Sequence, residues 1–90
     1  MSRFERTVTL LNQRGLHARA SAKFVTLASG LAARVEVEKD GSTVTGTSIM
    51  GLMMLGAAVG DTITIRAQGE GAEEALAALV RLVEEKFGEE

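Results

Sequence analysis

The sequence contains no cysteine, tryptophan or tyrosine, and each absence excludes a class of function. Without cysteine there is neither a disulfide framework nor thiolate chemistry, and for a domain this small that favours a reducing compartment. Base stacking on single-stranded nucleic acid would depend on three phenylalanines alone, and the formal net charge is −2. We therefore expect a cytoplasmic protein that does not bind nucleic acid.

Long apolar runs are also scarce. The first six residues lack the apolar core of a signal peptide. The uncharged stretch from Gly41 to Gly60 is long enough to span a bilayer, but serine, threonine and glycine interrupt it, and its apolar part runs only from Ile49 to Val59. We expect no membrane insertion, and the 90-residue length predicts a single domain over residues 1–90.

Hydrophobic periodicity predicts alternating strands and helices that form an α+β fold. Asp40-Gly41 is typical of a hairpin turn, and hairpins with short loops favour an antiparallel sheet with helices packed on one face. The expected elements are a strand over 4–10, a helix over 18–29, strands over 33–38 and 42–47, a short helix over 49–55, a strand over 61–68, and a helix over 72–87.

His17 is the only histidine, and it stands at the start of the predicted helix over 18–29. The first N–H groups of a helix lack partners and, with the helix dipole, form an anion pocket. A phosphoryl group on His17 would lie in that pocket, where the Arg19 guanidinium can bind phosphate oxygens. Positive surroundings favour the neutral imidazole, which is the nucleophilic form.

Other interpretations of these residues stay open. His17 can be a polar helix cap without chemistry, the protein can be a small-ligand-sensing α+β module, or His17 and Ser48 can belong to a hydrolytic or transfer enzyme. A metal site is not expected, because there is one histidine, no cysteine, and no acidic residue between Arg6 and Arg34. No nucleophile-elbow pattern supports a Ser-His-Asp triad.

Two segments together resemble a known family. Gly15-Leu16-His17-Ala18-Arg19 is similar to the phosphohistidine signature of HPr, the phosphocarrier of the bacterial phosphoenolpyruvate-dependent phosphotransferase system. The segment from Thr47 to Gly56 is similar to the HPr segment around its regulatory serine. The resemblance covers essentially the whole chain and implies an HPr-like open-faced β-sandwich, with a four-stranded antiparallel sheet and three helices on one face.

The resemblance also implies roles for individual residues. His17 would accept a phosphoryl group through Nδ1 from phosphorylated enzyme I and pass it to an enzyme IIA-type acceptor, as a stoichiometric carrier rather than an enzyme. No cofactor is implied, and a monomer is expected. The other implied residues are Ala18 and Arg19 for phosphate binding, Ser48 for phosphorylation by an HPr kinase/phosphorylase, and Ile49, Met50 and Met53 for partner docking.

Two features qualify the resemblance. Most carbohydrate-type HPr proteins have proline after the active-site arginine, whereas this chain has Ala20, which keeps the helix through its high propensity. The run from His17 to Val25 looks more like the nitrogen-type (NPr-like) branch, whose carriers serve regulatory relays. The methionines at positions 50, 53 and 54 are also compatible with a place in the core instead of a flexible docking surface.

Overall fold

The structure is a computed structural model that describes residues 3–89. Its elements are β1 (Arg3–Thr9), α1 (Ala18–Ser29), β2 (Arg34–Lys39), β3 (Ser42–Thr45), α2 (Ile49–Met54), β4 (Thr62–Gln68), α3 (Ala72–Glu84) and a short 3-10 helix, η1 (Lys86–Gly88).

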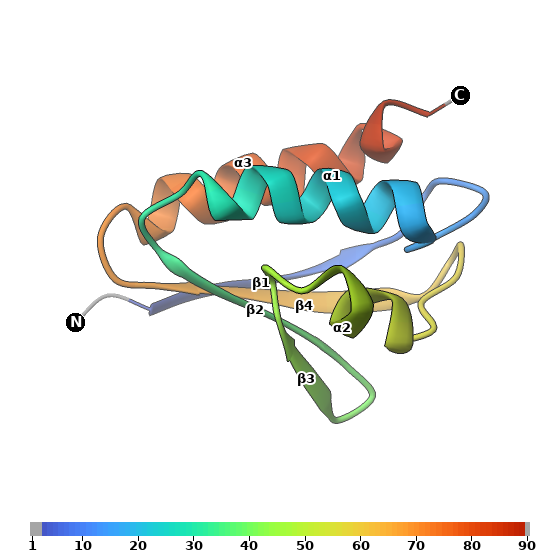
Figure 1. Cartoon of the computed structure of the whole chain (residues 1–90), viewed down its shortest axis with the longest axis horizontal. Coiled ribbons are helices and arrows are strands. Elements are labelled where there is room, and N and C mark those ends of the chain that lie inside the picture. The colour runs from blue at the N-terminus through green and yellow to red at the C-terminus, as the bar shows by residue number, and fades with distance from the viewer. Residues whose placement is uncertain (1–2, 90) are drawn as a thin grey trace.

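The strands form one antiparallel sheet in the order β1-β4-β2-β3, which leaves β1 and β3 at the edges. Helices α1 and α3 lie side by side across one face of the sheet, and α2 packs against α1 and β3 (Figure 1). The expected α+β fold is confirmed. The start of α1, the loop before β4 and the C-terminal segment gather at one end of the molecule (Figure 1).

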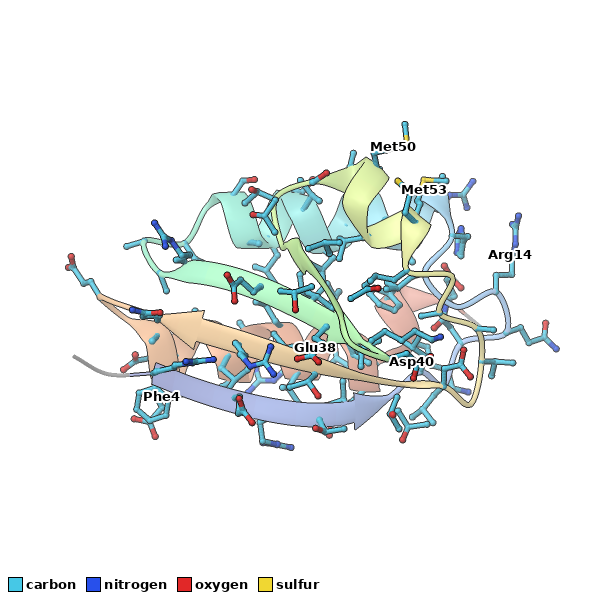
Figure 2. The ribbon with its side chains drawn as sticks, turned by 90° about the horizontal axis from the view of Figure 1, so that it is seen from below. Phe4, Arg14, Glu38, Asp40, Met50 and Met53 are labelled. Carbon is cyan, nitrogen blue, oxygen red and sulfur yellow. The ribbon has the colours of Figure 1, made fainter. Side chains whose placement is uncertain are left out.

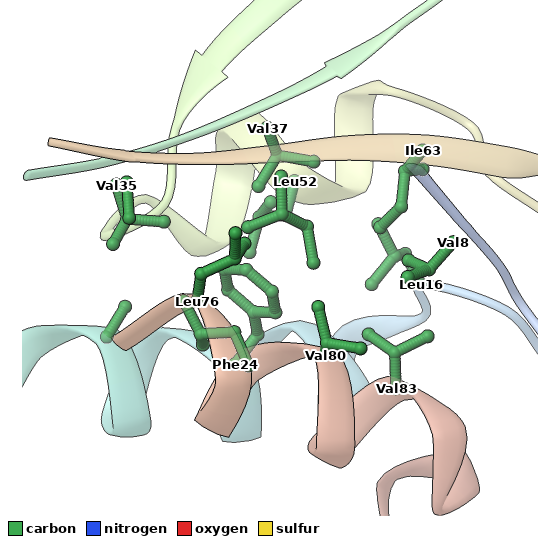
Figure 3. Close-up of a cluster of buried hydrophobic side chains, with 14 of the residues drawn as sticks. Val8, Leu16, Phe24, Val35, Val37, Leu52, Ile63, Leu76, Val80 and Val83 are labelled. Carbon is green, nitrogen blue, oxygen red and sulfur yellow. The ribbon is translucent and has the colours of Figure 1, made fainter. Parts of the chain in front are cut away.

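The core lies between the sheet and the helices, and alternation along the strands produces it. Every second side chain of β2 and β4 points inward, and these meet Phe24 of α1, Leu52 of α2 and the apolar stripe of α3 (Figure 3). Each fully buried leucine, isoleucine or phenylalanine contributes about 1.5–3 kcal/mol through removal from water. The opposite face stays polar, and there Arg66 donates hydrogen bonds to Glu5 and Glu38.

The C-terminal end differs from the expectation of one helix through Phe87. Helix α3 ends at Glu84, and Lys86, Phe87 and Gly88 adopt φ values of 59°, 56° and 77°. Three left-handed residues in succession cannot continue a right-handed helix, so they form a separate turn after α3. Phe87 is nevertheless 1% exposed, because the turn directs its ring into the core. Helical periodicity placed Phe87 on the buried face correctly but gave the wrong backbone conformation.

Candidate functional site

Glycine is required at position 15 to shape the loop that enters α1. Gly15 has a φ of +59°, and a Cβ there would lie 2.3 Å from the carbonyl oxygen of Ala57. The next residue, Leu16, donates its N–H to that same oxygen at 3.0 Å. A side chain at position 15 would push the loop away from the segment before β4. This close contact fixes the direction in which the chain reaches His17.

His17 caps the N-terminus of α1, as the sequence predicted. Its backbone is extended, and Nδ1 accepts a hydrogen bond from the N–H of Arg19 at 3.3 Å. A ring nitrogen that accepts a hydrogen bond carries no proton, so the Nδ1 lone pair faces the free amides of the helix. The side chain is 16% exposed, so it is neither sealed in the core nor free in solvent.

The opposite ring nitrogen contacts a residue that sequence reasoning missed. Nε2 of His17 lies 2.5 Å from Oε2 of Glu89, and Oε1 of the same carboxylate accepts a hydrogen bond from Nδ2 of Asn12 at 3.1 Å. Asn12 is buried and also donates to the carbonyl oxygen of Gly15 at 2.8 Å. Glu89 is 72 residues from His17, so no local pattern marks it.

The environment of Glu89 favours its charged form. The hydrogen bond with His17 is the largest cause that lowers the pKa of Glu89, and the hydrogen bond from Asn12 lowers it further. The positive charge of Lys23 acts in the same direction, while burial opposes these effects. Glu89 is therefore an ionised carboxylate, which can only accept hydrogen bonds.

The two residues expected to bind phosphate are exposed in the first turn of α1. Ala18 and Arg19 both face solvent, and no acidic residue stands in that turn. Arg19 also lines an open groove with Lys23 of the same helix. Arg14 projects from the preceding loop into solvent at this end of the molecule (Figure 2).

The second sequence motif forms the start of α2. Ser48 is the N-cap of this helix, and its Oγ accepts the N–H of Gly51 at 2.9 Å. Ile49, Met50 and Met53 are 41%, 68% and 41% exposed, and Met50 and Met53 project outward from the helix (Figure 2). Met54 is 78% exposed, so the interpretation of this methionine cluster as core is wrong.

Residues 3–89 contain neither a membrane-spanning helix nor a cluster of metal ligands. In this range no helix has both the length and the apolar character needed to cross a bilayer. The same residues contain no group of three or more histidine, cysteine, aspartate or glutamate side chains arranged to hold a metal ion.

Comparison with known proteins identifies the family. A family model described as the PTS HPr component phosphorylation site matches residues 4–85. The chain belongs to the HPr family. It is 44% identical to the phosphocarrier protein HPr of Cupriavidus necator over 85 residues, which cover 94% of this chain and 96% of the relative. It is 40% identical to the phosphocarrier protein NPr of Shewanella violacea over 89 residues, which cover 99% of this chain and 98% of the relative.

Solved HPr structures share the fold. HPr-C-His from Thermoanaerobacter tengcongensis is 47% identical and superposes with a TM-score of 0.93, covering 97% of this chain and 98% of that one. HPr from Bacillus anthracis is 42% identical with a TM-score of 0.88, covering 92% and 99%. The open-faced HPr fold is thus confirmed, and the chain has the phosphocarrier role of the phosphotransferase system.

Proposed function

We propose that Nδ1 of His17 is the atom that carries the phosphoryl group. The observation that carries this proposal is the orientation of the ring, with an unprotonated Nδ1 directed at the N–H of Arg19. The Nδ1 lone pair attacks phosphorus, the N–P bond forms, and the bond between phosphorus and the donor breaks. The donor is phosphorylated enzyme I. Transfer to an enzyme IIA-type acceptor reverses the step, because the N–P electron pair returns to Nδ1.

The first turn of α1 supplies the phosphate site. The N–H groups of Ala18 and Arg19 donate to the phosphate oxygens, and the N–H of Arg19 exchanges its bond to Nδ1 for one of them. The exposed Arg19 guanidinium adds a charge-assisted, bidentate contact. The absence of acidic residues from this turn keeps the potential favourable for a dianion.

The patch formed by Ile49, Met50 and Met53 is the surface that docks enzyme I and the acceptors. All three side chains are exposed on one short helix, and flexible methionine suits a surface that meets several partners. The carrier works as a monomer in the cytoplasm and is regenerated stoichiometrically rather than turning over a substrate. No cofactor takes part.

Ser48 is a regulatory phosphorylation site beside this patch, modified by an HPr kinase/phosphorylase. A phosphate on Oγ adds about two negative charges next to Ile49 and Met50. We expect Ser48→Asp to slow phosphorylation of His17 by enzyme I. Ser48→Asn, which keeps a cap residue without the charge, is the control. Equal rates for Ser48→Asp and wild type would contradict this role.

The relay is of the nitrogen-type branch. Similarity to NPr over 99% of the chain and alanine at position 20, where most carbohydrate-type carriers have proline, support this assignment. The test is a comparison of phosphoryl transfer from the phosphorylated carrier to IIA-type acceptors of the two branches. Faster transfer to a sugar-specific acceptor would contradict it.

Incubation with enzyme I and labelled phosphoenolpyruvate tests the central proposal. We expect acid-labile label on the wild-type protein, none on His17→Ala, and slower labelling of Arg19→Ala. Ser48→Ala is a matched control, because it removes the hydroxyl of the second proposed phosphorylation site and keeps His17. A non-covalent ligand-sensing module would show no change of mass in any of these proteins.

A further inference from the structure

The C-terminal segment, residues 86–89, contacts the core, helix α1 and the residues around His17. Phe87 anchors it in the core, and Nζ of Lys23 donates to the carbonyl oxygen of Phe87 at 2.6 Å. Beyond this anchor, the Glu89 carboxylate contacts both His17 and Asn12. The carboxylate lies on the side of the ring opposite the helix amides, because it contacts Nε2 whereas the N–H of Arg19 contacts Nδ1.

These contacts select one form of the imidazole. The ionised carboxylate only accepts, so Nε2 donates its proton to Glu89. Nδ1 accepts the N–H of Arg19 and carries no proton. The opposite tautomer would place an N–H against the Arg19 N–H and a lone pair against the carboxylate. A hydrogen bond at one ring nitrogen sets the protonation of the other, and here it leaves the lone pair on Nδ1.

We propose that Glu89 is a positioning residue for phosphoryl transfer, which holds His17 in the Nε2–H tautomer and balances the charge that the ring gains when Nδ1 binds phosphorus. This inference rests on the proposed role of Nδ1 as the acceptor. It assigns a function to a carboxylate that lies outside both sequence motifs.

The charge balance explains why a carboxylate suits this position. Nδ1 uses its lone pair to form the N–P bond, and Nε2 keeps its proton, so the ring becomes positively charged. The carboxylate, 2.5 Å from Nε2 before transfer, stabilises that charge. In onward transfer the N–P electron pair returns to Nδ1, and the leaving group is neutral imidazole rather than imidazolate. The proton held between Nε2 and Glu89 therefore keeps the phosphorylated carrier competent to donate.

Asn12 supports Glu89 and makes a carboxamide a poor replacement. Each carboxylate oxygen accepts one hydrogen bond, Oε1 from Asn12 and Oε2 from His17. Glutamine at position 89 has a single acceptor oxygen. If that oxygen faces Asn12, the amide NH2 faces Nε2 and draws the ring toward the tautomer with a proton on Nδ1. Glu89→Gln should therefore remove the nucleophilic lone pair from part of the population.

The experiment combines ¹⁵N NMR of the His17 ring with transfer kinetics in Glu89→Gln, Glu89→Ala and the control Glu85→Gln. Glu85 is an exposed residue four positions earlier, and its substitution changes the net charge equally. For wild type and Glu85→Gln we expect ring signals of the Nε2–H tautomer. In Glu89→Gln and Glu89→Ala the Nδ1–H form should appear, and transfer should slow about tenfold in both directions, as for loss of other partners that orient a functional imidazole.

The outcomes separate this inference from the proposed function. No label on wild-type protein, or full label on His17→Ala, would overturn the role of His17 itself. Normal labelling of wild type together with unchanged tautomer and rates in both Glu89 variants would overturn only the role of Glu89. A slower rate with an unchanged tautomer would overturn the selection of the tautomer by Glu89, because loss of charge balance or a structural defect gives that result.

Discussion

Replacement of Phe87 by alanine tests whether the C-terminal segment is part of the folded core. Phe87 is 1% exposed although its backbone is left-handed, and the residue before it is left-handed too. Two non-glycine residues with positive φ cost about 1–2 kcal/mol each. The turn is held only because burial of the phenyl ring and the Lys23 hydrogen bond to the Phe87 carbonyl exceed this cost.

The expected loss follows from these terms. Truncation of a buried phenylalanine to alanine costs about 3–5 kcal/mol. Without the ring the strained left-handed turn can relax, which recovers part of the lost stability. We therefore expect a net loss of about 2–3 kcal/mol in the free energy of unfolding. A domain of this size has a total stability of roughly 5–13 kcal/mol, so the variant should still fold. At about 4–8 °C per kcal/mol, the Tm should fall by roughly 8–24 °C.

Urea unfolding followed by circular dichroism measures this loss, and Phe87→Leu is the matched control, with an expected cost below about 1.5 kcal/mol. Below its Tm, Phe87→Ala should also give His17 ring signals like those of Glu89→Ala, because the detached segment no longer holds the carboxylate. A loss under about 1 kcal/mol with unchanged His17 signals would refute the reasoning, since it would mean that the segment is not anchored by Phe87.

Three further perturbations test other contacts of the structure. Gly15→Ala should lower the free energy of unfolding in urea by at least about 2 kcal/mol and slow the labelling of His17, because its Cβ would lie 2.3 Å from the Ala57 oxygen. Wild-type stability of this variant would contradict that contact. Ser48→Ala should lose about 1 kcal/mol through its missing N-cap bond, and no loss would show that the cap is dispensable. Folding lowers the pKa of Glu89 from 4.5. The contribution of ionised Glu89 to the free energy of unfolding is therefore present above that value, and it is lost as pH falls through the lower folded pKa. Urea unfolding at a series of pH values should therefore show a smaller acid loss for Glu89→Gln than for wild type, and parallel curves would count against the contact with His17.

Local features of the site were predictable from the sequence. His17 reaches the first helical amides because Arg19 is two residues away, and the geometry of a helix start fixes that relation wherever the helix packs. Ser48 caps α2 through the same kind of local geometry, since its Oγ accepts the N–H of Gly51, three residues later. The exposure of Met53 and Met54 was not predictable in this way, because a six-residue helix has too few turns for periodicity to separate a buried face from an exposed one.

Sequence alone therefore determined the strands and helices and the placement of His17 at a helix N-terminus, since these depend on neighbours within a few residues. The hairpin and the short loops predicted the antiparallel α+β class, but not which distant strands pair. Tertiary structure decided the rest. The need for glycine at position 15 arises from a carbonyl 42 residues later, at Ala57. The contact between the Glu89 carboxylate and His17 depends on a left-handed turn, and that turn forms only because the Phe87 ring packs into the core. Contacts of this kind join segments that are distant in the chain, and their energy exists only once the core has packed.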